Sequence, residues 1–137
     1  MQLELPGLCD LQVNGFAGVD FNSPATTEAD VMRAIDRLRA TGVTRFLPTL
    51  ITSSRERFSQ CARRLAQTNH AAIAGLHLEG PYIAAEDGPR GAHPREHVVP
   101  ASVEDFARRQ DAAEGRIRLV TLAPEVPGGL APIDYLV

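Results

Sequence analysis

The stretch that decides the fold is Ala71-Ala-Ile-Ala-Gly-Leu-His77-Leu-Glu79-Gly80-Pro81, a short apolar run that ends in an acidic residue and a Gly-Pro breaker. An apolar run of this length between turn residues is typical of a strand that is buried on both faces of a parallel sheet. We therefore expect a strand over residues 71–78, with His77 facing the same side as Glu79. A carboxylate at the end of such a strand is costly unless a partner charge, a cation or solvent meets it. Glu79 is thus either a capping or salt-bridged residue, or part of a functional site.

Strand-like and helical segments alternate on both sides of this stretch. Alternation of this kind predicts an α/β fold with a parallel sheet and right-handed crossovers. The other expected strands are residues 8–14, 43–52 and 117–122, and the expected helices begin after Thr27, Ser53, Ser102 and Gly128.

Local signals mark the starts of the first two helices. Thr27, with Asp30 three residues later, is the expected N-cap of a helix that ends near Gly42. Ser53 and Glu56 have the spacing of a capping box at the start of the next helix.

Two segments depart from a regular pattern. Pro48 lies inside an expected strand, and because proline cannot donate to a ladder, we expect a bulge or the end of the strand near it. The loop over residues 80–100 is rich in Gly, Pro and His, and its length favours a functional role. Its residues His93, Glu96 and His97 match the H-x-x-E-H string of inverzincin peptidases, but that motif requires a helix, so we interpret the match as chance.

The number of βα units suggests two architectures. Four units are half of an eight-unit barrel, which typically has about 250 residues, whereas this chain has 137. The alternatives are a small open α/β domain and the first half of a barrel. We expect a partial TIM-like (β/α)8 barrel with parallel strands, formed by residues 1–137.

The composition excludes several classes of partner. The net charge is −3, aromatic residues make up 5% of the chain and tryptophan is absent, so nucleic acid is not an expected partner. No apolar run approaches the length needed to span a membrane, and the first residues lack the pattern of a signal peptide. Cytoplasmic residence without a membrane partner is therefore expected.

Polar residues alternate along the first strand. Asp10, Gln12 and Asn14 fall on one face because strand side chains repeat every two residues. They are either inward polar groups that need partners, or the wet face of a half-exposed strand. Active sites of barrels lie at the C-terminal ends of the strands. If the first and third strand ends are neighbours, the two amides converge with Glu79 and His93.

Taken together, these segments resemble the N-acetylglucosamine-6-phosphate deacetylases of the amidohydrolase superfamily. The matching blocks follow the family's order and cover nearly the whole chain. They are PGLCDLQVNG at residues 6–15, GVTRFLPTLIT at 42–52, GLHLEGP at 75–81, GAHP at 91–94 and VTLAPE at 120–125.

The resemblance implies roles for four residues. Gln12 and Asn14 stand where most of the superfamily has two histidines, and this loss of nitrogen ligands favours a single divalent metal, zinc-like or, as an alternative, iron. Glu79 matches a metal ligand, and His93 matches the catalytic histidine that hydrogen-bonds the acetyl carbonyl of the substrate. The implied reaction is metal-assisted hydrolysis of N-acetylglucosamine 6-phosphate, an amino-sugar phosphate, to glucosamine 6-phosphate and acetate.

Several features of the family have no match in this sequence. The family's two histidine ligands, catalytic aspartate, phosphate-binding residues and β-sandwich have no counterpart in residues 1–137. The loop between Glu79 and His93 also looks two residues longer than in the family. We therefore expect the N-terminal half of the barrel, inactive in isolation, from a homo-oligomeric enzyme. The alternatives are a non-catalytic fragment or interaction module, and another amidohydrolase.

Overall fold

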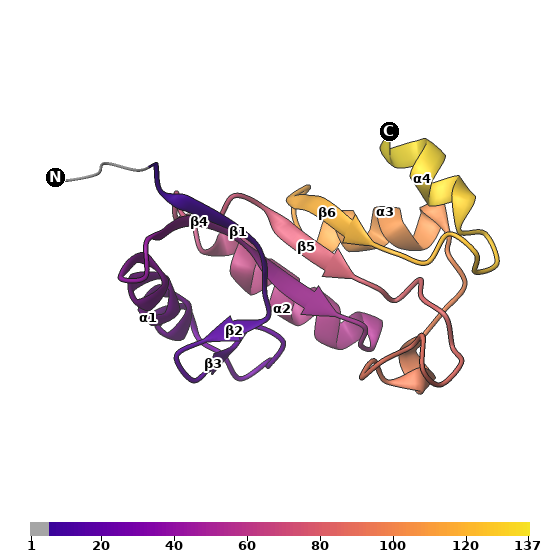
Figure 1. The fold of residues 1–137 in the computed structure, drawn as a ribbon, viewed down its shortest axis with the longest axis horizontal. Helices are drawn as coiled ribbons and strands as arrows, with labels where there is room; N and C mark the ends of the chain where they lie inside the picture. Colours follow the sequence, from indigo (N-terminus) through magenta and orange to yellow (C-terminus); the bar gives the residue numbers. More distant parts are fainter. Residues whose placement is uncertain (1–5) are drawn as a thin grey trace, which may run out of the picture.

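The computed structural model describes residues 6–137. Helices and strands alternate along the chain, apart from a short hairpin near its start (Figure 1). The strands are β1 (Leu8–Val13), β2 (Gly15–Phe16), β3 (Val19–Asp20), β4 (Val43–Ile51), β5 (Leu76–Glu79) and β6 (Ile117–Thr121). The helices are α1 (Glu28–Arg39), α2 (Arg55–Gln67), α3 (Val103–Ala112) and α4 (Leu130–Leu136), with a 3₁₀ helix, η1, at Arg95–His97.

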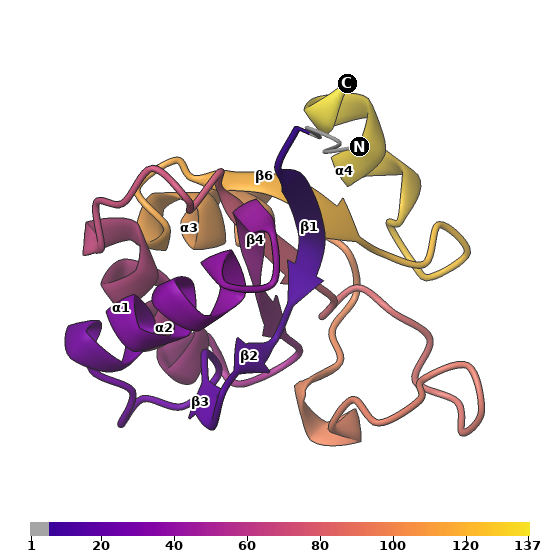
Figure 2. The ribbon, with the colours of Figure 1, turned by 60° about the vertical axis from the view of Figure 1, so that its left-hand side comes forward.

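The main sheet has four strands in the order β1-β4-β5-β6, and every pair is parallel. Helices α1, α2 and α3 lie on one side of it (Figure 2). This arrangement confirms the α/β prediction of four parallel strands with alternating helices. Since parallel strands point the same way, the segments that follow β1, β4 and β5 meet at one end of the sheet, and the loop before α3 projects from that end (Figure 1).

One of the two N-caps expected from the sequence agrees with the structure, and the third helix begins after Ser102 as expected. Thr27 caps α1 in a capping box with Asp30, and Ser102 caps α3. The box at Ser53 is wrong by one residue. Ser54 caps α2 instead, because its hydroxyl accepts a hydrogen bond from the N–H of Arg57 at 3.2 Å.

The third strand is shorter than expected. β5 begins at Leu76, and within the segment before it only Ile73 forms an isolated bridge, to Phe46. Gly75 has φ +154°, and a Cβ atom there would lie 2.3 Å from the side chain of Arg118. The apolar run predicted a strand over residues 71–78 because periodicity cannot separate a buried turn from a buried strand.

The irregular pairing expected near Pro48 is confirmed, although β4 continues through it. Between Asp10 and Val13 the register of β1 against β4 shifts, and Val13 pairs with Pro48. The N–H of Val13 donates to Oγ1 of Thr49 at 3.0 Å. A side chain of β4 thus satisfies a backbone donor of β1.

A hairpin of β2 and β3 follows β1, and the sequence did not predict it. Its turn contains Ala17 (φ 53°) and Gly18 (φ 80°), the positive angles that a tight hairpin turn requires. Just beyond it, the side chain of Asn22 donates to the carbonyl of Thr49 at 2.9 Å and accepts from the N–H of Ile51 at 2.8 Å. These bonds fasten the hairpin to the end of β4.

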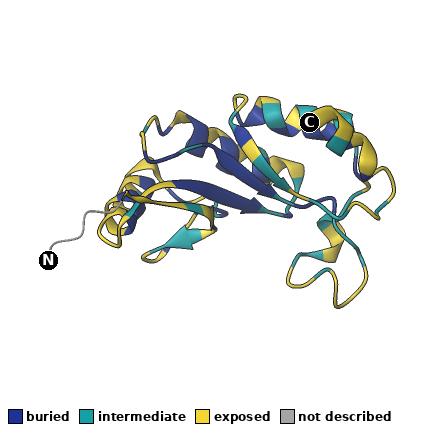
Figure 3. Cartoon of the chain, turned by 45° about the horizontal axis from the view of Figure 1, so that its top comes forward, coloured by how far each residue is buried: buried dark blue, intermediate teal, exposed yellow. Residues whose placement is uncertain are grey.

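The core lies between the sheet and its layer of helices (Figure 3). β4 from Phe46 onward and most of β5 are buried, whereas the edge strand β1 exposes Leu8 and Leu11. Burying each large apolar side chain contributes about 1.5–3 kcal/mol, so the helices hold the sheet firmly from this side. None of the helices within residues 6–137 is long and apolar enough to cross a bilayer.

Candidate functional site

A cavity of about 430 Å³ lies where the strand ends meet. Four of the residues that line it are Gln12 of β1, Asn14 just beyond β1, Glu79 at the end of β5 and His93 of the following loop. The structure thus brings together the four side chains that the sequence singled out. β1 and β5 are not direct neighbours, since β4 lies between them and contributes Ile51 to the cavity.

Glu79 and His93 face each other across this cavity. Nε2 of His93 lies 3.9 Å from Oε1 of Glu79, and the two side chains are 18% and 20% exposed. Glu79 is held in register by its neighbours in the sheet, Ile51 on β4 and Thr121 on β6. The pair can therefore act together on a group that enters the cavity.

Two residues that the sequence did not single out hold His93 in place. Thr52, immediately after β4, has its Oγ1 atom 3.0 Å from Nδ1 of the ring. Arg90 also lines the cavity, and it donates to the carbonyl of His93 at 2.6 Å while forming an ion pair with Asp87. No spacing signal marks Thr52, because it lies 41 residues from its partner.

His77 does not line the cavity but belongs to a buried polar row across the sheet. Its Nδ1 atom is 3.3 Å from Oγ1 of Thr49 on β4, and its Nε2 atom is 2.8 Å from Oγ1 of Thr121 on β6. Burial lowers the pKa of His77 below its usual range, although the charge of Glu79 acts in the opposite direction. A ring with both nitrogen atoms engaged serves to join strands.

Asp10 does not line the cavity either. Its carboxylate accepts a hydrogen bond from the N–H of Gln12 at 3.0 Å. The register shift after Asp10 breaks the regular alternation on which the shared face was predicted. Gln12 and Asn14 are both exposed, so their amides are open to a ligand.

The peptidase-like string in the loop has no helical context. Only Arg95–His97 form a turn of 3₁₀ helix, and His93 precedes it. His93 and His97 therefore do not share the face of an α-helix, which the zinc motif requires.

The donor atoms at the cavity are of the kinds that bind divalent cations in proteins. Glu79 offers a carboxylate, His93 an imidazole and Gln12 and Asn14 amide oxygens, which suit a divalent cation. The Nδ1 atom of His93 is already engaged with Thr52. Within residues 6–137, no group of three or more His, Cys, Asp or Glu side chains is placed to hold a metal ion. These residues alone therefore do not complete a metal site.

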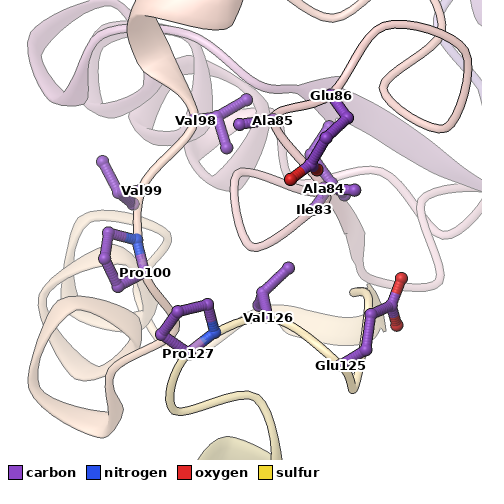
Figure 4. Close-up of a pocket in the computed structure, with 10 residues that line it drawn as sticks. All are labelled: Ile83, Ala84, Ala85, Glu86, Val98, Val99, Pro100, Glu125, Val126 and Pro127. Atoms are coloured by element: carbon purple, nitrogen blue, oxygen red, sulfur yellow. The ribbon is translucent and has the colours of Figure 1, made fainter.

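A second cavity, of about 290 Å³, lies between the loops that follow β5 and β6 (Figure 4). Its lining is mostly aliphatic, with Val98, Val99 and Val126 among it, and its charged lining residues are Glu86 and Glu125. Among residues 6–137, no basic or hydroxyl side chain lines it. The strand-end cavity is therefore the better candidate for chemistry.

The chain is similar to known enzymes along most of its length. Its alignment with an N-acetylglucosamine-6-phosphate deacetylase of Caenorhabditis elegans is 144 positions long, has 37% identity and covers 96% of this chain and 34% of the relative. It is 40% identical to the deacetylase of the same name from Homo sapiens over 132 residues, which cover 88% and 31%. The chain thus spans about a third of the length of the curated relatives it matches.

Solved structures agree with this likeness. A mutant N-acetyl-D-glucosamine-6-phosphate deacetylase from Mycobacterium smegmatis, in complex with N-acetyl-D-glucosamine-6-phosphate, superposes with a TM-score of 0.83 at 35% identity, over 93% of this chain and 33% of that one. The N-acetylglucosamine-6-phosphate deacetylase of Pasteurella multocida gives a TM-score of 0.81 at 30% identity, over 96% and 34%. No model of a known protein family matches the chain. The curated relatives and structural neighbours are N-acetylglucosamine-6-phosphate deacetylases, which confirms the resemblance drawn from the sequence.

Proposed function

We propose that the protein carrying residues 1–137 hydrolyses the acetamide of N-acetylglucosamine 6-phosphate to give glucosamine 6-phosphate and acetate. The observation that carries the proposal is the pair of Glu79 and His93 facing one cavity at the strand ends, in a chain whose relatives and structural neighbours are deacetylases of this name. The similarity does not favour an interaction module or a different amidohydrolase.

Gln12, Asn14, Glu79 and His93 each have a role in this proposal. Nε2 of His93 donates a hydrogen bond to the acetyl oxygen, where negative charge develops as the amide is attacked. Glu79 is a carboxylate ligand for one divalent metal, and Gln12 and Asn14 orient polar groups or water beside it. When bound, such an ion, zinc-like or iron, polarises the amide and activates water.

Residues 1–137 would form the N-terminal half of an amidohydrolase barrel. In this proposal the remaining metal ligands, the catalytic carboxylate, the phosphate site and the β-sandwich come from other sequence. The proposed substrate class is supported by the Mycobacterium smegmatis neighbour, which is in complex with N-acetyl-D-glucosamine-6-phosphate. A homo-oligomer in the cytoplasm is the assembly and location that we expect.

The test is acetate release from N-acetylglucosamine 6-phosphate by the natural protein in its native length, with zinc or iron added. Unphosphorylated N-acetylglucosamine serves as the comparison substrate, and Glu79→Gln as the comparison protein. The proposal predicts turnover that the variant largely loses. A wild-type protein that binds metal but releases no acetate would refute it.

A further inference from the structure

We infer that Thr52 is a positioning residue that holds the neutral ring of His93 in the tautomer with its hydrogen on Nε2. The inference starts from the contact of the Thr52 hydroxyl with Nδ1 of the ring. Thr52 is 1% exposed, so water does not compete for this contact. Only the consequence for catalysis rests on the proposed function.

The direction of the hydrogen bond follows from the acceptors around Thr52. A hydroxyl has one hydrogen to give, and its ordinary O–H donor distances are about 2.5–3.0 Å to oxygen. Two groups that can accept this hydrogen lie near: Nδ1 of His93 at 3.0 Å, which accepts in one tautomer and donates in the other, and the carbonyl of Glu79 at 3.5 Å. The carbonyl lies beyond the ordinary donor range, which favours donation of the hydroxyl hydrogen to the ring nitrogen. Nδ1 is then an acceptor, and the hydrogen of the neutral ring is on Nε2.

The opposite side of the ring supports the same tautomer. Nε2 points towards Oε1 of Glu79, 3.9 Å away. An ionised carboxylate only accepts hydrogen bonds, so an N–H directed towards it is attractive, whereas a lone pair would be repelled. Thr52 and Glu79 therefore favour the same proton position from opposite sides of His93.

Gly80 makes room for this arrangement. It has φ +73°, and a Cβ atom at this position would lie 2.1 Å from Oγ1 of Thr52. Any side chain here would displace the hydroxyl that contacts His93. The end of β4 and the end of β5 thus fit together at Thr52 and Gly80 so that the ring of His93 is fixed from behind.

For the proposed reaction, the contact between Thr52 and His93 supplies a hydrogen-bond donor that is in place before the substrate binds. The Nε2–H of His93 faces the cavity, as a donor to an acetyl oxygen must. Thr52 lies behind the ring and is not among the residues that line the cavity, so in this inference it acts through His93.

The direct test is the tautomer of His93, read from long-range ¹H–¹⁵N correlation spectra of the ¹⁵N-labelled chain at alkaline pH, where imidazoles are neutral. The wild-type ring should show a protonated Nε2 and an unprotonated Nδ1. Thr52→Val, which keeps the side-chain volume but removes the hydroxyl, should shift part of the population to a protonated Nδ1, because only Glu79 then favours Nε2–H, and Thr52→Ser should restore the wild-type pattern. Thr44→Val is the matched control, since Thr44 is exposed and distant from the ring in the sheet.

The outcomes separate this inference from the proposed function. A protonated Nδ1 in the wild-type chain would overturn the inference without any variant, as would an unchanged tautomer in folded Thr52→Val. In the native-length enzyme, Thr52→Val should lower kcat by roughly 10–100-fold with little change in KM, the scale seen when a group that orients a histidine is removed. A tautomer that follows the prediction in a protein without deacetylase activity would refute only the proposed function.

Discussion

The phenolic oxygen of Tyr82 lies 2.9 Å from Oδ2 of Asp105, and this bond fastens the start of the loop over residues 80–100 to helix α3. The same carboxylate accepts from Nε of Arg109 at 2.8 Å and from Nη2 of Arg55 at 2.7 Å. The guanidinium of Arg109 also lies 5.0 Å from the ring centre of Phe58. Burial and the charge of Asp105 raise the pKa of Tyr82 well above its ordinary value. Tyr82 therefore remains a hydrogen-bond donor at neutral pH.

Removing the Tyr82 hydroxyl should destabilise the fold. Tyr82→Phe deletes a buried hydrogen bond to a charged group, which costs about 1.5–3 kcal/mol of unfolding free energy. Urea denaturation measures this cost. Tyr135→Phe is the control, because Tyr135 is 59% exposed, and substitutions at such sites usually change stability by less than about 0.5 kcal/mol. Equal midpoints for the two variants would contradict the assigned contact.

Asp105 should contribute to loss of stability in acid. Burial acts to raise the pKa of Asp105, but the hydrogen bonds and charge of Arg109, with Tyr82 and Arg55, outweigh it and lower the pKa. A lowered folded-state pKa gives stability that is complete above the unfolded value, about 3.9, and is lost as the pH falls through the folded value. Asp105→Asn should therefore lose less stability than the wild type between about pH 5 and pH 2.

The same variant should be costly at neutral pH. Arg109 is only 4% exposed, and removing its carboxylate partner leaves a buried charge, at a cost of about 3–5 kcal/mol. Asp30→Asn is the comparison, since hydrogen bonds from Thr27 lower the pKa of the half-exposed Asp30 to about 2. Urea titrations at several pH values measure both effects. An acid slope that is identical in Asp105→Asn and the wild type would exclude Asp105 as a source of it.

Gly80→Ala should be more harmful than Gly88→Ala. Both glycines have positive φ, at +73° and +96°, so alanine costs about 1–2 kcal/mol of backbone strain at each. At Gly80 the new methyl group also meets Thr52, which adds about 1–3 kcal/mol for overpacking, whereas nothing lies within 4 Å at Gly88. Thermal or urea unfolding of the two variants gives the comparison. Indistinguishable stabilities would show that the Thr52 hydroxyl moves aside freely.

Glu79→Gln should weaken metal binding. A neutral amide is a much poorer ligand for a divalent cation than a carboxylate, and the proposed site offers few other donors within residues 6–137. Metal content of the native-length protein after dialysis, by elemental analysis, measures the effect. Glu86→Gln, in the other cavity, is the matched control. Unchanged stoichiometry and affinity in Glu79→Gln would remove Glu79 from the ligand set.

His93→Asn should slow turnover while leaving the metal bound. Loss of one donor to a developing oxyanion lowers kcat by roughly 10²–10³-fold. Steady-state kinetics of acetate release, with metal content measured in parallel, test this. His97→Asn is the control, because His97 lies in the same loop but does not line the cavity. Wild-type turnover in His93→Asn would show that His93 is a surface histidine with no role in turnover.

Local signals in the sequence predicted most of the elements. The cap at Thr27 could be read because its partner, Asp30, lies three residues away. Ser53 and Ser54 both follow a strand, and spacing alone could not tell which of the two would cap α2. The prediction was also wrong for the first part of the expected third strand, because the apolar residues there are buried in a turn and not in a strand.

The site was predictable only in part. Gln12, Asn14, Glu79 and His93 share a cavity because parallel strands end at one edge, which follows from the order of the elements. The contact between Thr52 and His93 depends on how the loop after β5 folds back on β4, and no pattern in the sequence encodes it. The exclusion of Asp10 depends likewise on a local register shift.

The strand order β1-β4-β5-β6 is also the order in which these strands leave the ribosome. Each strand of the main sheet can pair with the one synthesised before it, without waiting for a distant segment to be inserted between them. Pairing each strand with the previous one keeps the sequence separation of contacts lower than insertion of a later strand would, which favours faster folding among parallel sheets. A sheet assembled in this way can form progressively during translation, and the strand formed last is its open edge until the next one is synthesised.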